Sequence, residues 1–176
     1  MLPSGHISWF AEIGLGDRPR VGGKGGSLGE LQRAGIAVPP GFVVRTGAFE
    51  RFLQEIERTA PVRARVEALA PDDLPEIQAC SRDLRHRIEA AALPADVAAD
   101  IGSAHAALAG DARIPVAVRS SATMEDAADA SFAGLQDTFL WVTTAADALD
   151  RVRSCWASLY SAESISYRRA RRFPEA

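Results

Sequence analysis

The densest glycine cluster of the chain is VGGKGGS, residues 21–27. Ser27 stands three residues before Glu30, the spacing of a capping box, and this predicts a helix that begins at Ser27 and ends before Gly35. Glycines let backbone N–H groups approach an anion closely, the start of a helix adds a positive dipole, and Lys24 adds a full charge. Taken by itself, the cluster fits a phosphate site and a flexible turn before a helix equally well.

Lys24 is the only lysine among the 20 basic residues of the chain. Because every other cation is an arginine, a lone ammonium group in a glycine cluster indicates a site that needs a compact point charge. The cluster is not a Walker A loop, since Gly25 follows Lys24 where Ser or Thr is required. It is not a dinucleotide-binding fingerprint either, since Leu28 stands where the third glycine belongs.

A second candidate cluster is VAVRSSAT, residues 116–123, in which a β-type run stops at Arg119. An arginine at the carboxyl end of a strand, followed by two hydroxyl side chains, can bind a phosphate through its guanidinium fork. The alternative is a structural ion pair between Arg119 and Glu125 or Asp126. Taken by itself, this cluster favours the ion pair.

A third candidate cluster is SFAGLQDT, residues 131–138. Strand-like segments at 131–133 and 138–142 flank its glycine, which predicts a hairpin. A hairpin of small residues can cover a nucleotide and donate backbone amides to its phosphates. The alternative is an ordinary hairpin with a glycine turn.

Short strands and amphipathic helices are predicted for the rest of the chain. The expected segments are an extended stretch at 7–14, a strand at 41–44, a helix capped by Thr46, two or three surface helices over 61–109 and a helix over 149–160. The surface helices are expected to break at three prolines, Pro71, Pro75 and Pro94. Soft boundaries within the single unit fall near residues 61 and 111.

The composition predicts a folded, soluble protein: 47% of the 176 residues are hydrophobic and the net charge is −3. Because basic residues are not in excess, the composition predicts no binding to nucleic acid or to an anionic membrane through a basic surface. Cys80 and Cys155 form neither a disulfide framework nor a metal cluster, and His86 and His105 lack partners at ligand spacing, so ordinary helix positions are expected for them. Without a signal-peptide pattern or a membrane-spanning run, the expected location is the cytoplasm.

Four motifs occur in a specific order: VGGKGGSLGEL at 21–31, VPPGF at 38–42, VAVRSSATMED at 116–126, and ASFAG at 130–134 with Thr138. Together they resemble the N-terminal nucleotide-binding domain of the phosphoenolpyruvate synthase, pyruvate phosphate dikinase and rifampicin phosphotransferase family. The resemblance covers about residues 13–167. It implies an α+β fold over residues 1–176, as the first part of an ATP-grasp domain with an incomplete second lobe.

The resemblance also implies roles for individual residues. Lys24 matches the family's phosphate-contacting lysine, and Arg119 matches its nucleotide-phosphate arginine. Gly134 and Thr138 match positions that meet ATP through the covering hairpin, and Gln136 beside them is a weaker candidate. No residue of the chain receives a certain catalytic or metal-binding role.

Two departures from the family pattern lie close to these positions. Gly25-Gly26 stands where an Asn-Ala type pair is more usual, which affects the stiffness of the loop. Leu135 stands at a common glutamine, so a polar contact near the nucleotide is lost there.

In the family, the acidic Mg²⁺ ligands come from the second lobe and a mobile domain carries the phosphate-accepting histidine. We therefore expect a fragment, a split-gene product or a standalone module that binds ATP, with Mg²⁺ held outside this chain. Its partners would be the missing lobe and the phosphohistidine domain, in the same or a separate chain. The expected function is ATP binding for a phosphotransferase that phosphorylates a carrier histidine and then an acceptor, with pyruvate ahead of rifampicin and no catalysis by this chain alone. The alternative is a non-catalytic module that senses nucleotides or binds a partner.

Overall fold

The computed structural model describes residues 5–110, 114–123, 137–173 and 175. The predicted strand at 131–133 and the predicted site residues Gly134 and Gln136 lie outside the described residues. The same holds for Glu125 and Asp126, the alternative ion-pair partners of Arg119.

Two antiparallel pairs of short strands form the β part of the described chain. β1 (Ile7–Trp9) pairs with β2 (Phe42–Val44), and β3 (Val116–Arg119) pairs with β4 (Thr138–Val142). After β1 the chain makes two single-turn 3₁₀ helices, η1 (Phe10–Glu12) and η2 (Leu15–Asp17). Together with the helices, these strands confirm the predicted α+β class, although the pairing of β3 with β4 was not among the predictions.

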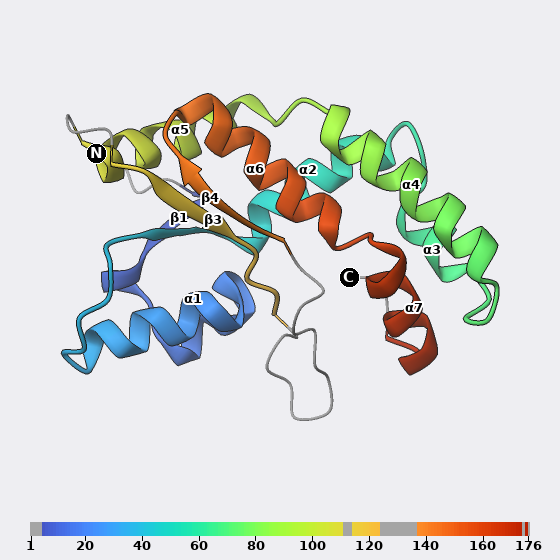
Figure 1. Cartoon of the computed structure of the whole chain (residues 1–176), viewed down its shortest axis with the longest axis horizontal. Coiled ribbons are helices and arrows are strands. Elements are labelled where there is room, and N and C mark those ends of the chain that lie inside the picture. The colour runs from blue at the N-terminus through green and yellow to red at the C-terminus, as the bar shows by residue number, and fades with distance from the viewer. Residues whose placement is uncertain (1–4, 111–113, 124–136, 174, 176) are drawn as a thin grey trace.

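The helices form two unequal layers around the strands (Figure 1). α1 (Arg18–Arg33) lies on one side of the strands, and α5 (Ala95–Ala109) and α6 (Ala145–Ser158) lie on the other. The remaining helices are α2 (Thr46–Glu57), α3 (Arg63–Glu67), α4 (Leu74–Ala90) and α7 (Ala162–Arg171). α3, α4 and α7 gather at the end of the molecule away from α1 (Figure 1).

Two hydrophobic cores hold the larger layer together. The first contains Phe52 of α2 and Ile77 of α4, both without exposed surface. In the second, Ile7 of β1 packs with Ile101 of α5. The partly buried Trp156 of α6 packs against both cores, so α6 joins the helical end of the molecule to the strands. Burial of such side chains contributes about 1.5–3 kcal/mol each, which makes these contacts the main support of the fold.

Three helices, α3, α4 and α5, lie within residues 61–109, where two or three were predicted, but one of the expected breaks is wrong. Pro75 lies in the first turn of α4, where the missing N–H of proline costs no hydrogen bond. Asp73 caps this helix through its side chain, which accepts a hydrogen bond from the backbone N–H of Glu76 at 3.1 Å. Thr46 is likewise not a cap: Arg45 holds the N-cap position of α2, and Thr46 is its first helical residue.

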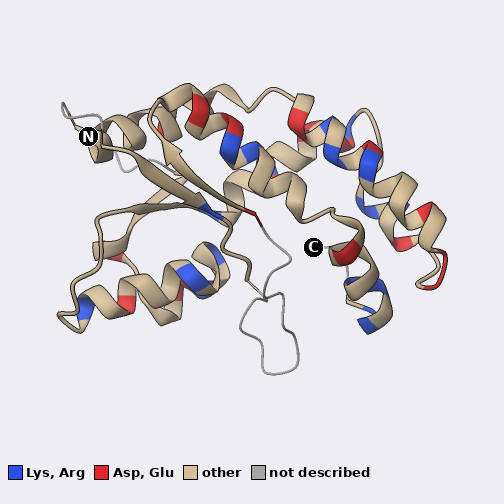
Figure 2. Ribbon diagram, viewed as in Figure 1, with Lys and Arg blue, Asp and Glu red and all other residues tan. Residues whose placement is uncertain are grey.

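Charges of both signs follow the helices, while the strands are almost bare of them (Figure 2). Within the described ranges, no three His, Cys, Asp or Glu side chains come together as a metal site would require. In the same part of the chain, no helix combines the length and the apolar character needed to cross a membrane.

Candidate functional site

The glycine cluster lies inside α1, and its backbone is kinked at Gly22. The φ and ψ angles of Gly22 are 73° and 173°, whereas the neighbouring residues continue the helix on both sides. The predicted helix start at Ser27 is therefore wrong, because the helix resumes directly after Gly22. Ser27 accepts a hydrogen bond from Arg18 Nη2 at 3.3 Å, and Glu30 Oε2 accepts one from the backbone N–H of Leu15 at 3.2 Å, so neither forms the expected capping box.

The second candidate cluster packs directly against this kink. Ser121 Oγ donates a hydrogen bond to the carbonyl oxygen of Val21 at 2.9 Å and accepts one from the backbone N–H of Gly25 at 3.0 Å. We call these two hydrogen bonds the Ser121 bridge. Next to it, the backbone N–H of Gly23 donates to the carbonyl oxygen of Ala122 at 2.9 Å. The fold thus brings together two motifs that are about 100 residues apart in the sequence.

Only glycine fits at the centre of this contact. A Cβ atom on Gly22 would lie 2.0 Å from the carbonyl oxygen of Ser121, far inside van der Waals contact. The positive φ at this position adds a second reason, because side chains other than glycine rarely adopt it. Gly22 therefore permits both the kink and the close approach of the segment that follows β3.

The backbone amides of the glycine cluster are engaged differently from the sequence-based expectation. Two of the first three N–H groups after the kink, those of Gly23 and Gly25, donate to Ala122 and Ser121. These are groups that a helix start leaves without an intrahelical partner, and here the protein itself satisfies them. Side-chain charge, above all that of Lys24, is therefore the main attraction that this turn offers to an anion.

Arg119 and Thr138 lie at the same end of the β3–β4 pair. They are direct partners in the antiparallel register, Arg119 as the last residue of β3 and Thr138 as the first of β4, and both are exposed. Arg119 is two residues from Ser121, so the Ser121 bridge links this strand end to the Lys24 turn. Of the predicted site residues, the structure places Lys24, Arg119 and Thr138 in one region.

Lys24 and Asp137, the residue just before β4, both lie near the thiol of Cys155 on α6. The pKa of the Cys155 thiol is raised to about 12, mainly by burial and to a smaller extent by the charge of Asp137, whereas the charge of Lys24 acts to lower it. Cys155 Sγ also lies 3.8 Å from the carbonyl oxygen of Asp137, its hydrogen-bond acceptor. Lys24 and Asp137 are thus both close enough to act on one thiol. Neither Asp137 nor Cys155 was predicted to belong to the site, and the only available signal was that Asp137 precedes Thr138.

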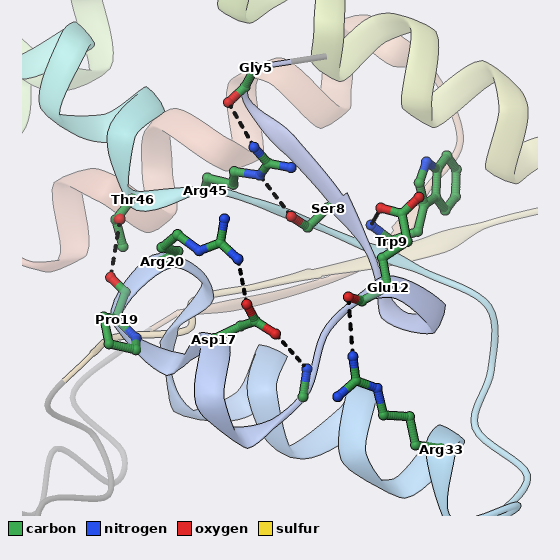
Figure 3. A network of polar contacts seen from close by, with 11 residues as sticks. Gly5, Ser8, Trp9, Glu12, Asp17, Pro19, Arg20, Arg33, Arg45 and Thr46 are labelled. Carbon is green, nitrogen blue, oxygen red and sulfur yellow. Dashed lines mark hydrogen bonds and ion pairs between the residues drawn. The ribbon is translucent and has the colours of Figure 1, made fainter. Parts of the chain in front are cut away.

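A polar network fastens the segments around α1 to the first strand pair (Figure 3). Arg45, just before α2, donates to Ser8 Oγ at 2.7 Å and to the carbonyl oxygen of Gly5 at 3.3 Å. Arg33, at the end of α1, donates to the carbonyl oxygen of Glu12 at 3.3 Å. These bonds tie β1 to the start of α2 and fix the far end of α1.

The near end of α1 is held by the same network (Figure 3). Asp17 accepts a hydrogen bond from the backbone N–H of Gly14 at 3.0 Å and pairs with Arg20. The hydrogen bond from Arg20 is the main reason that the pKa of Asp17 lies below its usual value. Thr46 Oγ1 donates to the carbonyl oxygen of Pro19 at 3.3 Å, so α2 also contacts the first turn of α1. Lys24 therefore lies on a helix that is fixed at both ends.

Comparison with known proteins identifies the family to which the chain is similar. The family model described as the pyruvate phosphate dikinase AMP/ATP-binding domain matches residues 18–176. A probable phosphoenolpyruvate synthase of Methanothermobacter thermautotrophicus is 42% identical over 171 residues, which cover 96% of this chain and 25% of that protein. The phosphoenolpyruvate synthase of Pyrococcus furiosus is 36% identical, over 92% of this chain and 24% of that protein.

The rifampicin phosphotransferase of Streptomyces sviceus is 43% identical over 150 residues, which cover 85% of this chain and 17% of that protein. The chain thus spans about a quarter or less of the length of these curated relatives. The relatives have two different names, phosphoenolpyruvate synthase and rifampicin phosphotransferase, and the chain is similar to proteins of both names.

Proposed function

The chain belongs to the pyruvate phosphate dikinase AMP/ATP-binding domain family, and from this premise we propose that it supplies the ATP-phosphate contacts of a phosphotransferase. The observation that carries the proposal is the contact between two motifs. The Ser121 bridge holds the turn that carries Lys24 against the strand end that carries Arg119. Two cationic positions brought close together suit the binding of a polyphosphate, because hydrogen bonds between cationic side chains and phosphate are strong.

Each proposed contact has a distinct chemical task. The Lys24 ammonium group provides a compact charge, and the Arg119 guanidinium provides a planar fork that can bind two phosphate oxygens. Thr138, opposite Arg119, adds a hydroxyl group at the same strand end. Gly134 and Gln136 complete the proposed set from the segment before β4. The two cations would stabilise the negative charge on the phosphoryl group as it is transferred.

The further steps of the reaction are proposed for the larger protein. The transferred phosphoryl group would pass to a carrier histidine and then to an acceptor. Pyruvate is the first candidate, because the phosphoenolpyruvate synthases cover more of this chain than the rifampicin phosphotransferase does. The second lobe and the histidine domain would come from the part of the relatives that this chain does not match.

Magnesium would have to be held largely by that other part. Within the described residues no group of three or more acidic, histidine or cysteine side chains comes together. Among the described residues, Asp137 offers a carboxylate next to Thr138, and Mg²⁺ usually takes more oxygen ligands than this from protein and phosphates together.

The test is to measure the affinity of the 176-residue chain and its variants for ATP, using NMR titrations that monitor the backbone amide signals. Lys24→Ala and Arg119→Ala should each weaken ATP binding by about tenfold or more, because hydrogen bonds to charged groups contribute about 1.5–3 kcal/mol. Arg82→Ala, which removes an exposed cation from α4 at the end of the molecule away from α1, is the matched control and should leave the affinity unchanged. Unchanged affinity in Lys24→Ala would contradict the proposed site.

A further inference from the structure

The Ser121 bridge connects both sides of the kink in α1 through a single hydroxyl group. Val21, which accepts its hydrogen, is the last residue before Gly22, and Gly25, which donates to its oxygen, lies in the first turn after it. Between them stands Lys24. The direction in which the Lys24 side chain leaves the helix therefore depends on a turn whose two edges are fixed to the same oxygen atom.

The same hydroxyl group is poorly suited to bind a phosphate itself. A serine hydroxyl has one hydrogen to donate, and that of Ser121 already goes to the carbonyl oxygen of Val21. Phosphate oxygens are acceptors, so they would have to displace this bond. A direct contact between the Ser121 hydroxyl group and a phosphate is thus disfavoured.

From these contacts we propose that Ser121 is a positioning residue, which sets the place of the Lys24 ammonium group relative to Arg119 without touching the ligand. The proposal rests on the proposed function, in which Lys24 and Arg119 bind the phosphates of ATP. Loss of the hydroxyl leaves the N–H of Gly25 and the carbonyl of Val21 without their partner. The turn then shifts to find new partners, and Lys24 moves with it.

The single lysine of the chain makes this proposal directly measurable. Protein labelled with ¹³C at lysine Cε gives one lysine side-chain NMR signal, and that signal belongs to Lys24. We expect Ser121→Ala to move this signal in the absence of any ligand and to speed hydrogen exchange of the Gly25 amide. With ATP as the probe, the apparent Kd reported by the lysine signal should rise by about tenfold, equivalent to about 1.4 kcal/mol.

Ser161→Ala is the matched control, because it also removes a serine that caps a helix. Ser161 Oγ accepts a hydrogen bond from the backbone N–H of Ser164 at 3.1 Å, at the start of α7. Both variants should lower the melting temperature by a similar amount. Only Ser121→Ala should change the lysine signal and the Kd for ATP.

Three results separate the two proposals. An unchanged lysine signal and an unchanged Gly25 exchange rate in Ser121→Ala overturn the positioning role, whatever ATP does. Equal weakening of ATP binding in both serine variants also overturns it, because general loosening of the fold would then be the cause. If ATP does not move the lysine signal of the unmodified chain, the proposed function fails, while the ligand-free measurements still decide the role of Ser121.

Discussion

At Gly22 a single missing side chain permits the contact on which the site depends. Replacement by alanine would place a Cβ atom 2.0 Å from the carbonyl oxygen of Ser121 and would force a φ of 73° on a residue that disfavours it. We expect Gly22→Ala to lower the free energy of unfolding by about 2 kcal/mol or more, since steric overlap and backbone strain add. Urea unfolding followed by circular dichroism measures this change.

Gly102 provides the comparison within the same molecule. It lies inside α5, its φ is not positive, and a Cβ atom there would meet nothing within 4 Å. Gly102→Ala should therefore stabilise the protein by about 0.5–1 kcal/mol, because alanine is the better helix former. The two substitutions should act in opposite directions, and a Gly22→Ala variant as stable as Gly102→Ala would contradict the structure of the kink.

Within β4, an irregular register exposes a large aromatic side chain. The pairing with β3 shifts between Val116 and Val118, and Trp141 opposite this shift has a φ of 61° and an exposed fraction of 80%. We expect Trp141→Gly to be more stable than Trp141→Val by about 1 kcal/mol, because glycine accepts a positive φ and a β-branched residue does not. Thermal unfolding of the two variants checks this, and a less stable glycine variant would show that the bulge is not strained.

The buried thiol of Cys155 on α6 lowers the stability of the protein at alkaline pH. Burial raises the pKa of Cys155 from 9.0 to about 12, so the folded chain keeps the thiol proton to higher pH than the unfolded chain does. Unfolding therefore releases a proton above pH 9, and stability is lost as the pH rises from about 9 to about 12, by at most about 1.4 kcal/mol per pH unit. Burial also raises the pKa of Tyr160, which adds a loss in the same direction at higher pH.

The variant Cys155→Ala measures how much of this loss of stability comes from the Cys155 thiol. Its free energy of unfolding should fall less between pH 7.5 and 10.5 than that of the unmodified chain, whatever the absolute values are. Urea titrations at the two pH values give the comparison. An identical fall in both proteins would place the proton release elsewhere.

Across the whole molecule, features that depend on local sequence were the predictable ones. The helix expected after residue 46 is present as α2, and the apolar spacing of Phe52, Leu53 and Ile56 on its buried face is a signal that can be read from local sequence. The family resemblance, now confirmed, rested on ordered motifs that can be read without a structure. The start of α1 could not be predicted, because a glycine-rich segment has low helix propensity and is stabilised here by hydrogen bonds that its backbone N–H groups donate to Ser121 and Ala122. Such contacts between distant segments leave no periodic signal in the sequence.

The described part of the site is open on the side that carries its charges. Arg119 and Thr138 are both exposed, and Lys24 is half-buried. Tight small-molecule sites usually enclose most of the ligand surface, and here only a few contacts offset the free-energy cost of association. The relatives are about four or more times longer than the segment they share with this chain, so they contain further residues that can cover a nucleotide.

The 176-residue chain alone should therefore bind Mg-ATP weakly, with a Kd of about 1 mM or higher, and should transfer no phosphoryl group. NMR titration with Mg-ATP measures the affinity, and release of AMP and phosphate in the presence of pyruvate, and then of rifampicin, measures the transfer. Lys24→Ala serves as the control, because weak binding that disappears in this variant comes from the proposed site rather than from non-specific contacts. Binding at micromolar concentration, or measurable turnover, would mean that this chain holds a complete active site and would contradict the assignment of the remaining steps to a larger protein.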